Sequence, residues 1–463
     1  MTRASTAEEV LLTGWGRTAP TRASVVKPGR TDDIVALLRT VGRRGALPRG
    51  LGRSYGDVAQ NGGGLVLDMT EMDDQVAVDD QHGTLKAGSG VSFDRVLHTT
   101  VPLGWFLPVT PGTRFVTLGG ALASDVHGKN HHRDGSIAAH VDGFELLDAD
   151  GMIRTVTPSG DVEVFDATLG GLGLTGIIAS AMVRLLRIET SRICVDTTRA
   201  DDLDGLMARM ESDDHRYHYS VAWVDALARG RNLGRGVLTQ GDHATLDQLP
   251  AGDRAEPLHY APRAIATVPR TIPNLMKPTT ARAMNELWFR KTPRRECGRL
   301  VPLAAFFYPL DAIAEWNRLY GRHGFVQYQF VVPFGEDGVV REVLDRLARS
   351  RIPSFLAVLK RFGGGCGMLS FPIAGWTLAL DIPAAIPGLN TILDAVDRLV
   401  ADAGGRVYLA KDARLDPALL PVMYQDLDRW REVREQLDPS HAFQSDLDRR
   451  LGLSSQARRA VLA

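Results

Sequence analysis

Three glycine-rich segments in the N-terminal part of this chain constrain its fold more than any other feature. They read RGLGRSYGD (residues 49–57), PGTRFVTLGGALASDVHGKNHH (111–132) and GGLGLTGII (170–178). Because glycine has no Cβ, backbone N–H groups in such segments can approach a ligand closely and bind pyrophosphate oxygens. None of the three is of the nucleotide-kinase or the Rossmann type. Together they predict a chain wrapped around an extended ligand that contains a pyrophosphate.

The overall composition limits the classes of protein to which the chain can belong. Its 463 residues exceed what one hydrophobic core usually supports, which predicts two or three domains. The net charge of -1 gives no electrostatic basis for binding nucleic acid. The three cysteines, Cys194, Cys297 and Cys366, are far apart in the sequence. They therefore predict neither a disulfide framework nor a CxxC metal site.

The sequence carries no signal for secretion or for crossing a membrane. Glu8 and Glu9 interrupt the apolar residues near the N-terminus, so these residues do not form the core of a signal peptide. No run of 18 or more apolar residues is present either. We expect a soluble protein of the cytoplasm or the cell envelope, peripheral to the inner membrane at most.

Hydrophobic patterns in the first part of the chain predict an α+β arrangement. An amphipathic helix is expected over residues 31–46, capped by Thr31 or Asp32 and ended by Gly45. A strand over residues 47–49 leads into the first glycine-rich segment. An Asp-Gly turn at residues 150–151, between two alternating runs, predicts a β-hairpin.

A second region begins near Thr190 and predicts a separate antiparallel sheet with helices on one side. Strands are expected at residues 217–224, 300–308, 325–333, 355–360 and 376–382, and helices at residues 310–320, 339–350 and 389–403. The last helices, within residues 417–437, and the turn at 438–443 are expected to return to the first region.

Residues 262–299 form a basic and apolar segment that we expect to be a long loop. The segment contains nine lysines or arginines but only two acidic residues, Glu286 and Glu296, and five prolines interrupt it. Leu287 and Trp288 are among its apolar side chains. Two interpretations remain open: a solvated surface insertion, or a contact with anionic lipid headgroups at a membrane surface.

The order of the three glycine-rich segments resembles the FAD-binding domain of flavoproteins of the vanillyl-alcohol-oxidase type. Further motifs make nearly the whole chain similar to the decaprenylphosphoryl-β-D-ribose 2-oxidases, the flavin subunits of the epimerase that makes the arabinose donor of actinobacterial cell walls. These motifs are LTGWGRT, EWNRLYG, FVQYQF, LSFPIAGW and YLAKDAR. The resemblance implies an α+β fold with an FAD-binding domain at residues 1–190, a substrate-binding domain at 191–410 and a C-terminal return at 411–463.

The resemblance also implies a reaction and its residues. The ribose 2-hydroxyl would be oxidised to a 2-keto sugar, which an NADH-dependent keto-reductase would then reduce. Catalysis is assigned to Tyr55, His127 and Lys411. The implied substrate-binding residues are Lys129, Trp223, Gln327, Gln329, Lys360, Phe362 and Ala379. The implied FAD contacts are Arg49, Gly50, Leu51, Gly52, Arg53, Ser54, Tyr55, Pro111, Gly112, Thr113, Thr117, Gly119, Gly120, Ala123, Ser124, His127, Gly128, Asn130, Gly173, Gly176, Ile178, Tyr408 and Lys411.

Several of these residues also have simpler explanations. His127, His131 and His132 have a spacing that a helix could offer to zinc, but Gly128 and Asn130 disfavour a helix, so no metal site is expected. The expected role of His127 is polar contact or acid–base chemistry, whereas the other two histidines can be hydrogen-bonded core residues.

A lysine on a strand usually faces solvent, and Lys411 lies in the strand-like run YLAKDAR. If it is buried near the flavin instead, it can stabilise negative charge on the reduced ring or assist removal of a hydroxyl proton. In FVQYQF, Gln327 and Gln329 share one face of a strand, which either lines a sugar-binding pocket or is half exposed to solvent.

Two positions depart from related proteins. Many flavoproteins of this type carry a histidine in the first glycine-rich segment that bonds covalently to the flavin, whereas this chain has Arg53. The resemblance therefore implies non-covalent FAD. Mycobacterial members have a cysteine where this chain has Ala379. We expect inhibitors that bond to that thiol to form no adduct at this position.

Two other functions compete with the polyprenylphosphoryl-ribose oxidase. A soluble alditol or sugar-lactone oxidase would keep the flavin, but a small neutral polyol needs no basic and apolar segment such as residues 262–299. A flavin-binding scaffold without turnover is disfavoured by the joint presence of His127, Lys129 and Lys411.

Overall fold

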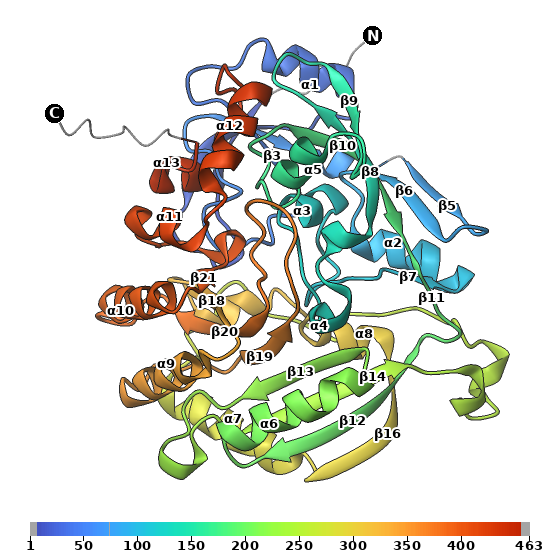
Figure 1. Cartoon of the computed structure of the whole chain (residues 1–463), viewed down its shortest axis with the longest axis vertical. Coiled ribbons are helices and arrows are strands. Elements are labelled where there is room, and N and C mark those ends of the chain that lie inside the picture. Colours follow the sequence, from blue (N-terminus) through green and yellow to red (C-terminus); the bar gives the residue numbers. More distant parts are fainter. Residues whose placement is uncertain (1–6, 74, 455–463) are drawn as a thin grey trace.

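Three larger β-sheets organise the part of the chain that the structure describes, residues 7–73 and 75–454 of a computed structural model. Figure 1 shows the N-terminal sheets and the C-terminal helices at one end of the molecule and the largest sheet at the other. The predicted α+β class is confirmed.

The N-terminal region holds two of these sheets. The first has the order β1-β2-β4-β3 and comprises β1 (Glu8–Leu12), β2 (Thr21–Val26), β4 (Leu65–Asp68) and β3 (Ala46–Arg49). The second, antiparallel sheet comprises β5 (Val76–Asp79), β6 (Thr84–Gly88), β10 (Ile177–Arg184), β8 (Val141–Leu147) and β9 (Ile153–Val156), in that order. The accompanying helices are α1 (Thr31–Leu38), α2 (Phe93–Thr100), α3 (Leu118–Ala123), α4 (His131–Asp134) and α5 (Val162–Thr168).

The third sheet is antiparallel and has eight strands in the order β16-β12-β14-β13-β19-β20-β18-β21. They are β16 (Arg295–Pro302), β12 (Arg192–Ala200), β14 (Gly236–His243), β13 (Tyr219–Val224), β19 (Ala357–Phe362), β20 (Gly375–Pro383), β18 (Phe325–Pro333) and β21 (Arg406–Val407). Its helices are α6 (Leu203–Asp213), α7 (Pro278–Lys291), α8 (Leu303–Phe307), α9 (Asp337–Arg349) and α10 (Leu389–Asp402).

Alternation along β18 decides which face of the eight-stranded sheet meets the N-terminal region. Tyr328 points toward α10, where its hydroxyl donates to Asp397 Oδ1 at 2.7 Å. Successive side chains of a strand point to opposite faces, so Gln327 and Gln329 lie on the other face. Gln329 reaches His127 of the N-terminal region there. The hypothesis of a half-exposed strand is wrong for these glutamines, because both are buried.

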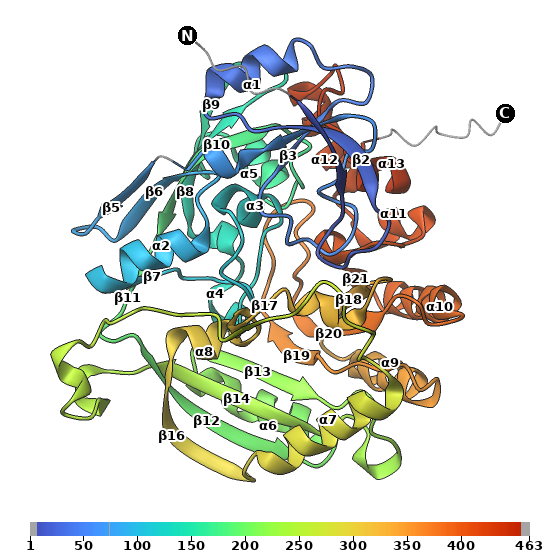
Figure 2. The same ribbon diagram turned by 180° about the vertical axis from the view of Figure 1, so that it is seen from behind.

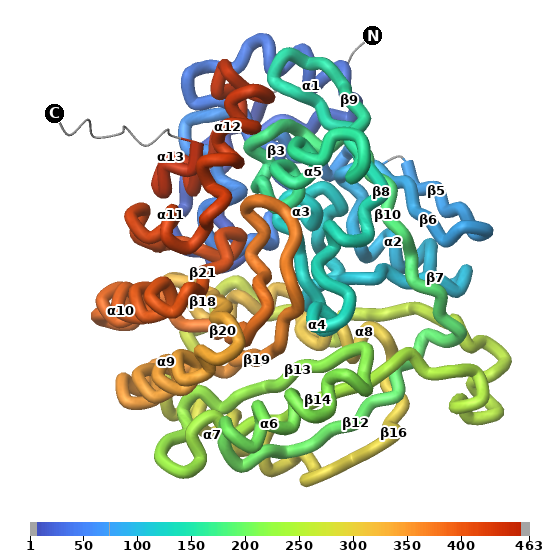
Figure 3. The backbone as a smooth tube through the Cα atoms, in the orientation of Figure 1, coloured from blue at the N-terminus to red at the C-terminus, as the bar shows by residue number. Residues whose placement is uncertain are grey.

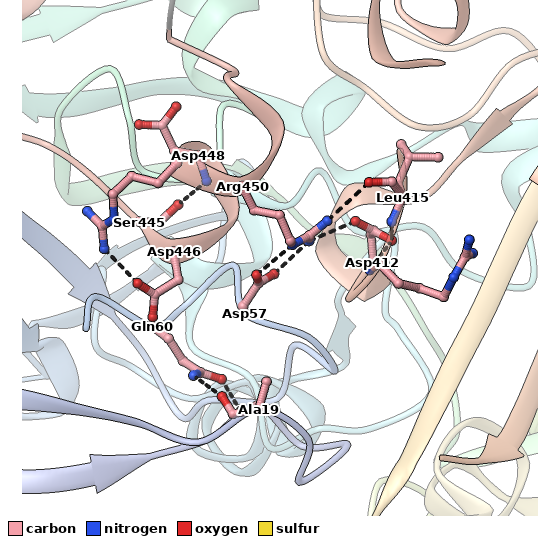
Figure 4. A network of polar contacts seen from close by, with 12 residues as sticks. Ala19, Asp57, Gln60, Asp412, Leu415, Ser445, Asp446, Asp448 and Arg450 are labelled. Atoms are coloured by element: carbon pink, nitrogen blue, oxygen red, sulfur yellow. Dashed lines mark hydrogen bonds and ion pairs between the residues drawn. The ribbon is translucent and has the colours of Figure 1, made fainter. Parts of the chain in front are cut away.

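The C-terminal helices return to the N-terminal sheets. They are α11 (Leu420–Met423), α12 (Leu427–Leu437) and α13 (Asp446–Leu451). Figure 4 shows how α13 is held: the Arg450 guanidinium donates to both oxygens of Asp57 and to Asp412 Oδ2, each at 2.8 Å. One arginine therefore joins the first glycine-rich segment to the residue that follows Lys411. The predicted division of the chain at residues 190/191 and 410/411 stays a prediction.

Most predicted elements lie where the sequence places them, including the 150–151 hairpin between β8 and β9 and the strand over Phe325–Pro333. The helix expected over residues 31–46 ends at Leu38. Its N-cap is Arg30, so neither Thr31 nor Asp32 caps it. β-Branched residues and Gly42 follow Leu38, and both disfavour continuation of a helix.

Three further predictions are wrong. The strand expected over residues 300–308 ends at Pro302, where α8 begins. The helix expected over residues 310–320 is two 3₁₀ turns around the short strand β17 (Ile313–Ala314), which pairs with β15 (Ala266–Thr267). The run around Lys411 is a 3₁₀ turn, Leu409–Lys411, and only β21 before it is a strand.

The basic segment is not one long loop, because it contains α7. Its prolines delimit this helix: Pro278 is the first helical residue, a position that suits its fixed φ, and Pro293 follows the helix end. Figure 2 shows α7 beside the eight-stranded sheet, at the end of the molecule away from α1. Among the described helices, none is both long and apolar enough to cross a bilayer.

Candidate active site

The three glycine-rich segments meet around one cavity in the N-terminal region. Its lining includes nine of the predicted cofactor contacts: Arg49, Gly50, Thr117, Gly119, Gly120, Ala123, Gly173, Gly176 and Ile178. Residues of β3 and α3 both line this cavity, and the two elements lie near each other in the tube drawing of Figure 3. Segments about 60 residues apart in the sequence therefore build a single site.

Close backbone approach explains why glycine occupies this wall. A Cβ on Gly50 would lie 2.1 Å from Thr117 Oγ1, and one on Gly119 would lie 2.7 Å from Ser89 Cβ. Gly173 has a φ of 76°, which side chains rarely adopt. The donors of this wall are backbone N–H groups, so the cavity suits the pyrophosphate of a dinucleotide.

Sequence reasoning missed five residues of the cavity lining: Pro48, Met69, Ser89, Thr168 and Leu172. Ser89 lies in a Gly-Ser-Gly turn after β6, a signal that could have been used. Leu172 has a φ of 58°, an unusual conformation for a residue with a side chain. This strain at a site-lining position has no single-residue signature in the sequence.

The remaining predicted cofactor contacts lie around the cavity or toward the eight-stranded sheet. Ser124 O accepts from the Tyr408 hydroxyl at 2.6 Å, and Thr113 donates to Asp311 Oδ1 at 2.7 Å. Asn130 Nδ2 donates to Pro108 O at 2.8 Å. The cavity lining does not include Leu51, Gly52, Arg53, Ser54, Tyr55, Pro111, Gly112, Thr113, Ser124, His127, Gly128, Asn130, Tyr408 or Lys411.

The register of the eight-stranded sheet places six predicted substrate residues on one face. In an antiparallel pair, directly opposed residues point to the same side. Gln329 lies opposite Ala379, Ala379 opposite Val358, and Val358 opposite Trp223. Gln327, Lys360 and Phe362 share this face by alternation along their strands. This is the face that His127 contacts, so the sheet and the glycine-rich segments enclose one site.

His127 connects the two halves of that site. Gln329 Nε2 lies 3.2 Å from His127 Nε2, and Lys360 Nζ lies 2.9 Å from His127 Nδ1 and 3.1 Å from Gly128 O. These contacts are all satisfied when Gln329 donates to Nε2, Nδ1–H donates to Lys360, and Lys360 donates to Gly128. That pattern requires a neutral imidazole and a neutral amine.

The electrostatics of the site agree with this pattern. Burial lowers the pKa of His127 well below its ordinary value, and Lys360 and Lys411 lower it further. Burial, together with the charges of Lys411 and Lys129, also lowers the pKa of Lys360 far below its ordinary value. His127 is therefore uncharged at neutral pH, and its surroundings favour the neutral amine of Lys360 over the ammonium form.

Lysines are concentrated at this site. The chain has seven lysines among 54 basic residues, and Lys129, Lys360 and Lys411 all lie here. Burial lowers the pKa of Lys129 to about 7, and its amino group donates to Phe306 O and lies 4.2 Å from the Phe306 ring centre. Burial lowers the pKa of Lys411 to about 8, and the charge of Asp381 opposes that shift. The site holds more potential positive charge than the carboxylate beside it can balance.

Tyr55 and Lys411 lie together at the edge of the site. Lys411 Nζ lies 5.5 Å from the Tyr55 ring centre and 5.8 Å from that of Tyr408. Burial raises the pKa of Tyr55, so its hydroxyl stays protonated. The possibility that Lys411 faces solvent does not hold, because the 3₁₀ turn directs it toward these rings.

Arg53, which the resemblance places at the position of the covalent histidine, contacts two aromatic rings. Its guanidinium lies 3.9 Å from the Trp15 ring centre and 5.5 Å from that of Phe115. The side chain is a cation held between two aromatic rings and offers no nucleophile to a flavin.

The histidine run makes three different contacts. His131 Nδ1 accepts from Gly363 N at 3.2 Å, and His132 Nε2 lies 3.2 Å from Tyr217 O, whereas His127 faces Gln329 and Lys360. The helix α4 begins only at His131. The helical zinc spacing therefore does not form, and no group of three or more candidate metal ligands occurs within residues 7–73 and 75–454.

Comparisons with known proteins agree with this geometry. A family model described as "FAD binding domain" matches residues 22–157, and one described as "D-arabinono-1,4-lactone oxidase" matches residues 384–451. The first match contains two of the three glycine-rich segments. FAD is therefore the cofactor of this protein, and the fold is that of the vanillyl-alcohol-oxidase type.

Three relatives differ in how much of the chain they match. Cytokinin dehydrogenase 3 of Oryza sativa subsp. japonica is 27% identical over 35% of this chain and 33% of its own. An uncharacterized protein in the mprA 5' region of Streptomyces coelicolor is 44% identical over 78% of this chain and 100% of its own.

The third likeness extends over both regions of the molecule. Decaprenylphosphoryl-beta-D-ribose oxidase of Mycolicibacterium smegmatis is 42% identical over 96% of this chain and 97% of its own length. The shared length includes the glycine-rich wall and the polar face of the eight-stranded sheet. The chain therefore belongs to the decaprenylphosphoryl-β-D-ribose oxidase family of FAD-dependent oxidoreductases.

Proposed function

We propose that this protein oxidises the ribose 2-hydroxyl of decaprenylphosphoryl-β-D-ribose to a ketone, the first half of epimerisation to the arabinose donor of cell-wall arabinan. The named relative supports the substrate, and the site supports its chemical class. A sugar needs polar groups that bind hydroxyls, and a phosphodiester needs cations. The eight-stranded sheet offers Gln327 and Gln329 for the first, and the buried lysines serve the second.

The observation that carries this proposal is the clustering of Lys129, Lys360 and Lys411. Burial lowers the pKa of each, and only Lys411 has an opposing carboxylate among the causes of its shift. A bound anion would raise these pKa values and offset the cost of burying the ammonium groups. A neutral polyol would leave that cost uncompensated. The site is thus better matched to a sugar phosphate.

The chain's own groups would prepare the substrate for oxidation. When bound, FAD supplies the acceptor for the hydride that leaves the ribose C2. Gln327 and Gln329 would orient the ring hydroxyls, since the carboxamide oxygen of each is buried without a hydrogen-bond partner among the described residues. His127, neutral and fixed by Lys360, would contact the sugar without adding charge.

Lys411 is the group that we assign to the proton of the 2-hydroxyl. A general base works best when its pKa lies near the working pH, and the pKa of Lys411 is about 8. In its neutral form the amine would accept the hydroxyl proton as the C2 hydride leaves. Tyr55, beside it and protonated, would donate a hydrogen bond to the same oxygen.

We further propose that FAD is bound without a covalent bond and that the 2-keto product passes to a separate NADH-dependent keto-reductase. Arg53 supports the first point, because it replaces the histidine that bonds to flavin in related proteins. Acid precipitation followed by filtration tests it. All flavin absorbance should appear in the filtrate, and yellow precipitate would contradict the proposal.

Residues 262–299 would hold the enzyme at a membrane that contains its lipid-linked substrate. On α7, the exposed fractions of Leu287 and Trp288 are 68% and 49%, while Phe289 faces the protein. Arg282, Arg290 and Lys291 are exposed around them. An exposed apolar stripe flanked by basic residues suits an anionic lipid surface, where each cation contributes about 1 kcal/mol.

Anaerobic mixing with a short-chain prenylphosphoryl ribose tests the proposed reaction. We expect the visible absorbance of bound FAD to bleach, with one ketone formed per flavin reduced. A flavin that stays oxidised with this substrate would refute the proposal.

The second candidate, an alditol or sugar-lactone oxidase, has one observation in its favour, the lactone-oxidase match over residues 384–451. Bleaching by an alditol or by D-arabinono-1,4-lactone alone would establish it.

A further inference from the structure

One buried carboxylate at the site has no part in the reaction described so far. Asp381 lies on β20 and has none of its surface exposed. Gln327, directly opposite on β18, donates to Asp381 Oδ1 at 2.5 Å. Within the described residues, Oδ2 has no hydrogen-bond partner. A buried carboxylate is costly unless a positive charge balances it, so its environment should contain a cation.

Lys411 lies where that cation is needed. In the eight-stranded sheet, β18 lies between β20 and β21. The 3₁₀ turn that ends in Lys411 follows β21. Tyr55, which Lys411 approaches, packs edge-on against Phe325 at 5.6 Å between ring centres. Phe325 lies on the same face of β18 as Gln327. Asp381 and Lys411 therefore stand on the two sides of Gln327, around one polar surface.

We propose that Asp381 is a positioning residue for the oxidation: its carboxylate supplies the negative charge that lets the Lys411 amine carry a proton inside the protein. The consequence for catalysis rests on the proposed function, whereas the pairing of the two residues does not.

The other groups around Lys411 cannot supply this charge. Lys360 on β19 and His127 from the second glycine-rich segment are cations when protonated, and their pKa values are lowered in part by Lys411. Asp412, the next residue in the chain, is bound to Arg450 instead. Tyr55 and Tyr408 are uncharged, because burial raises the pKa of each.

The titration behaviour of the pair is consistent with this role. Burial raises the pKa of Asp381 to about 7, against the hydrogen bond from Gln327 and the charge of Lys411. Burial lowers the pKa of Lys411 to about 8, against the charge of Asp381. Each group thus limits the shift that burial causes in the other. Removing the carboxylate charge should lower the pKa of Lys411 further.

The substitution Asp381→Asn removes the charge and keeps an oxygen that can accept from Gln327. Lysine labelled with ¹³C at Cε gives few NMR signals in the FAD-loaded protein, because the chain has only seven lysines. Loss of one signal in Lys411→Arg assigns it. We expect the Lys411 midpoint to fall by at least one pH unit in Asp381→Asn and to be restored in part by Asp381→Glu. An unchanged midpoint would overturn the proposal.

Asp397→Asn is a matched control, because Asp397 is equally buried but bonds to Tyr328 on the other face of β18. It should leave the Lys411 midpoint in place, and an equal shift in this variant would overturn a specific role for Asp381. The pH midpoint of flavin reduction should move with the NMR midpoint. If only the NMR midpoint moved, the positioning role would be refuted.

The two proposals can fail separately. A native enzyme whose flavin is never reduced by prenylphosphoryl ribose would refute the proposed function. A fall of the Lys411 midpoint in Asp381→Asn would still support the pairing in that case, since the NMR titration uses no substrate.

Discussion

At the residue scale, the site depends on burial, which moves the pKa values of Lys129 and Lys411 toward neutral pH. Lysine allows this because its ammonium loses its proton readily in a low-dielectric site, whereas arginine stays charged. The chain uses arginine for most of its basic positions, yet the site is built with lysines. Replacement of Lys411 by arginine should therefore preserve charge and abolish proton exchange.

The pH dependence of flavin reduction follows from the lowered pKa of Lys411. Below about pH 8 the amine is protonated and cannot accept a proton, so the reduction rate should rise with pH by up to tenfold per unit and level off above about 8. Stopped-flow reduction by prenylphosphoryl ribose from pH 6 to 9.5 measures this. A rate that falls above pH 8 would instead mean that Lys411 acts as an ammonium.

Ala379 sets the response to thiol-directed inhibitors. It lies opposite Gln329 on the substrate face, and a cysteine at this position would place its thiol in the site. The native protein should form no adduct there, and Ala379→Cys should gain one while retaining turnover. Peptide mass mapping is needed, because Cys297 and Cys366 are exposed and can react themselves. An adduct that fragmentation of the native peptide localises to residue 379 rather than to Cys366 would contradict the prediction.

The sequence could indicate most of these residues but not their partnerships. The family resemblance implied nine residues that line the cavity, and five of them are glycines, which a close backbone wall requires wherever a Cβ would collide. Asp381 escaped notice, since a single aspartate in an apolar strand has no local pattern. Only the register of β18 and β20 places it beside Gln327 and near Lys411.

At the scale of elements, α7 is the feature that sequence patterns misjudged. Its prolines and arginines suggested a loop, but the buried positions Ala281, Asn285 and Phe289 recur every four residues, as in a helix that packs on one side. Asn285 fastens it by donating to Asp225 Oδ1 at 2.8 Å. This spacing of the buried residues was hard to recognise in the sequence, because the opposite side of the helix is also apolar.

That opposite side predicts the membrane behaviour of the protein. The double substitution Leu287→Gln and Trp288→Gln should weaken binding to vesicles of anionic phospholipid at least tenfold, because it removes the apolar stripe while keeping the basic residues. Sedimentation with vesicles measures it. Ile153→Gln changes an equally exposed apolar residue at the other end of the molecule and should have no effect. Equal binding by the double variant would refute docking through α7.

At the scale of the whole molecule, α13 joins the C-terminal helices to the N-terminal region. Arg450 on α13 bridges Asp57 and Asp412, so the C-terminal helices hold both the first glycine-rich segment and the turn that carries Lys411 (Figure 4). The surroundings of Arg450 could not be predicted from the sequence, because its partners lie about 40 and 390 residues away.

Arg450→Met should lower the free energy of unfolding by about 3 kcal/mol, because two largely buried carboxylates lose their cation. It should also weaken FAD binding, which fluorescence of released flavin would detect. Arg429→Met removes the exposed pair with Glu163 and should change the stability little, because solvent screens that pair. Equal losses of thermal stability in the two variants would contradict the special role of Arg450.

The positions of α13 and α7 at opposite ends of the molecule have a practical consequence for experiments at surfaces. β2, the strand that pairs with β1, and α13 both lie at the end of the molecule away from α7 (Figures 1 and 2). A tether attached beyond either element would present α7 outward, toward a supported bilayer brought against it. Single-molecule adhesion measurements could then record the force needed to detach the helix from lipid without moving the tether.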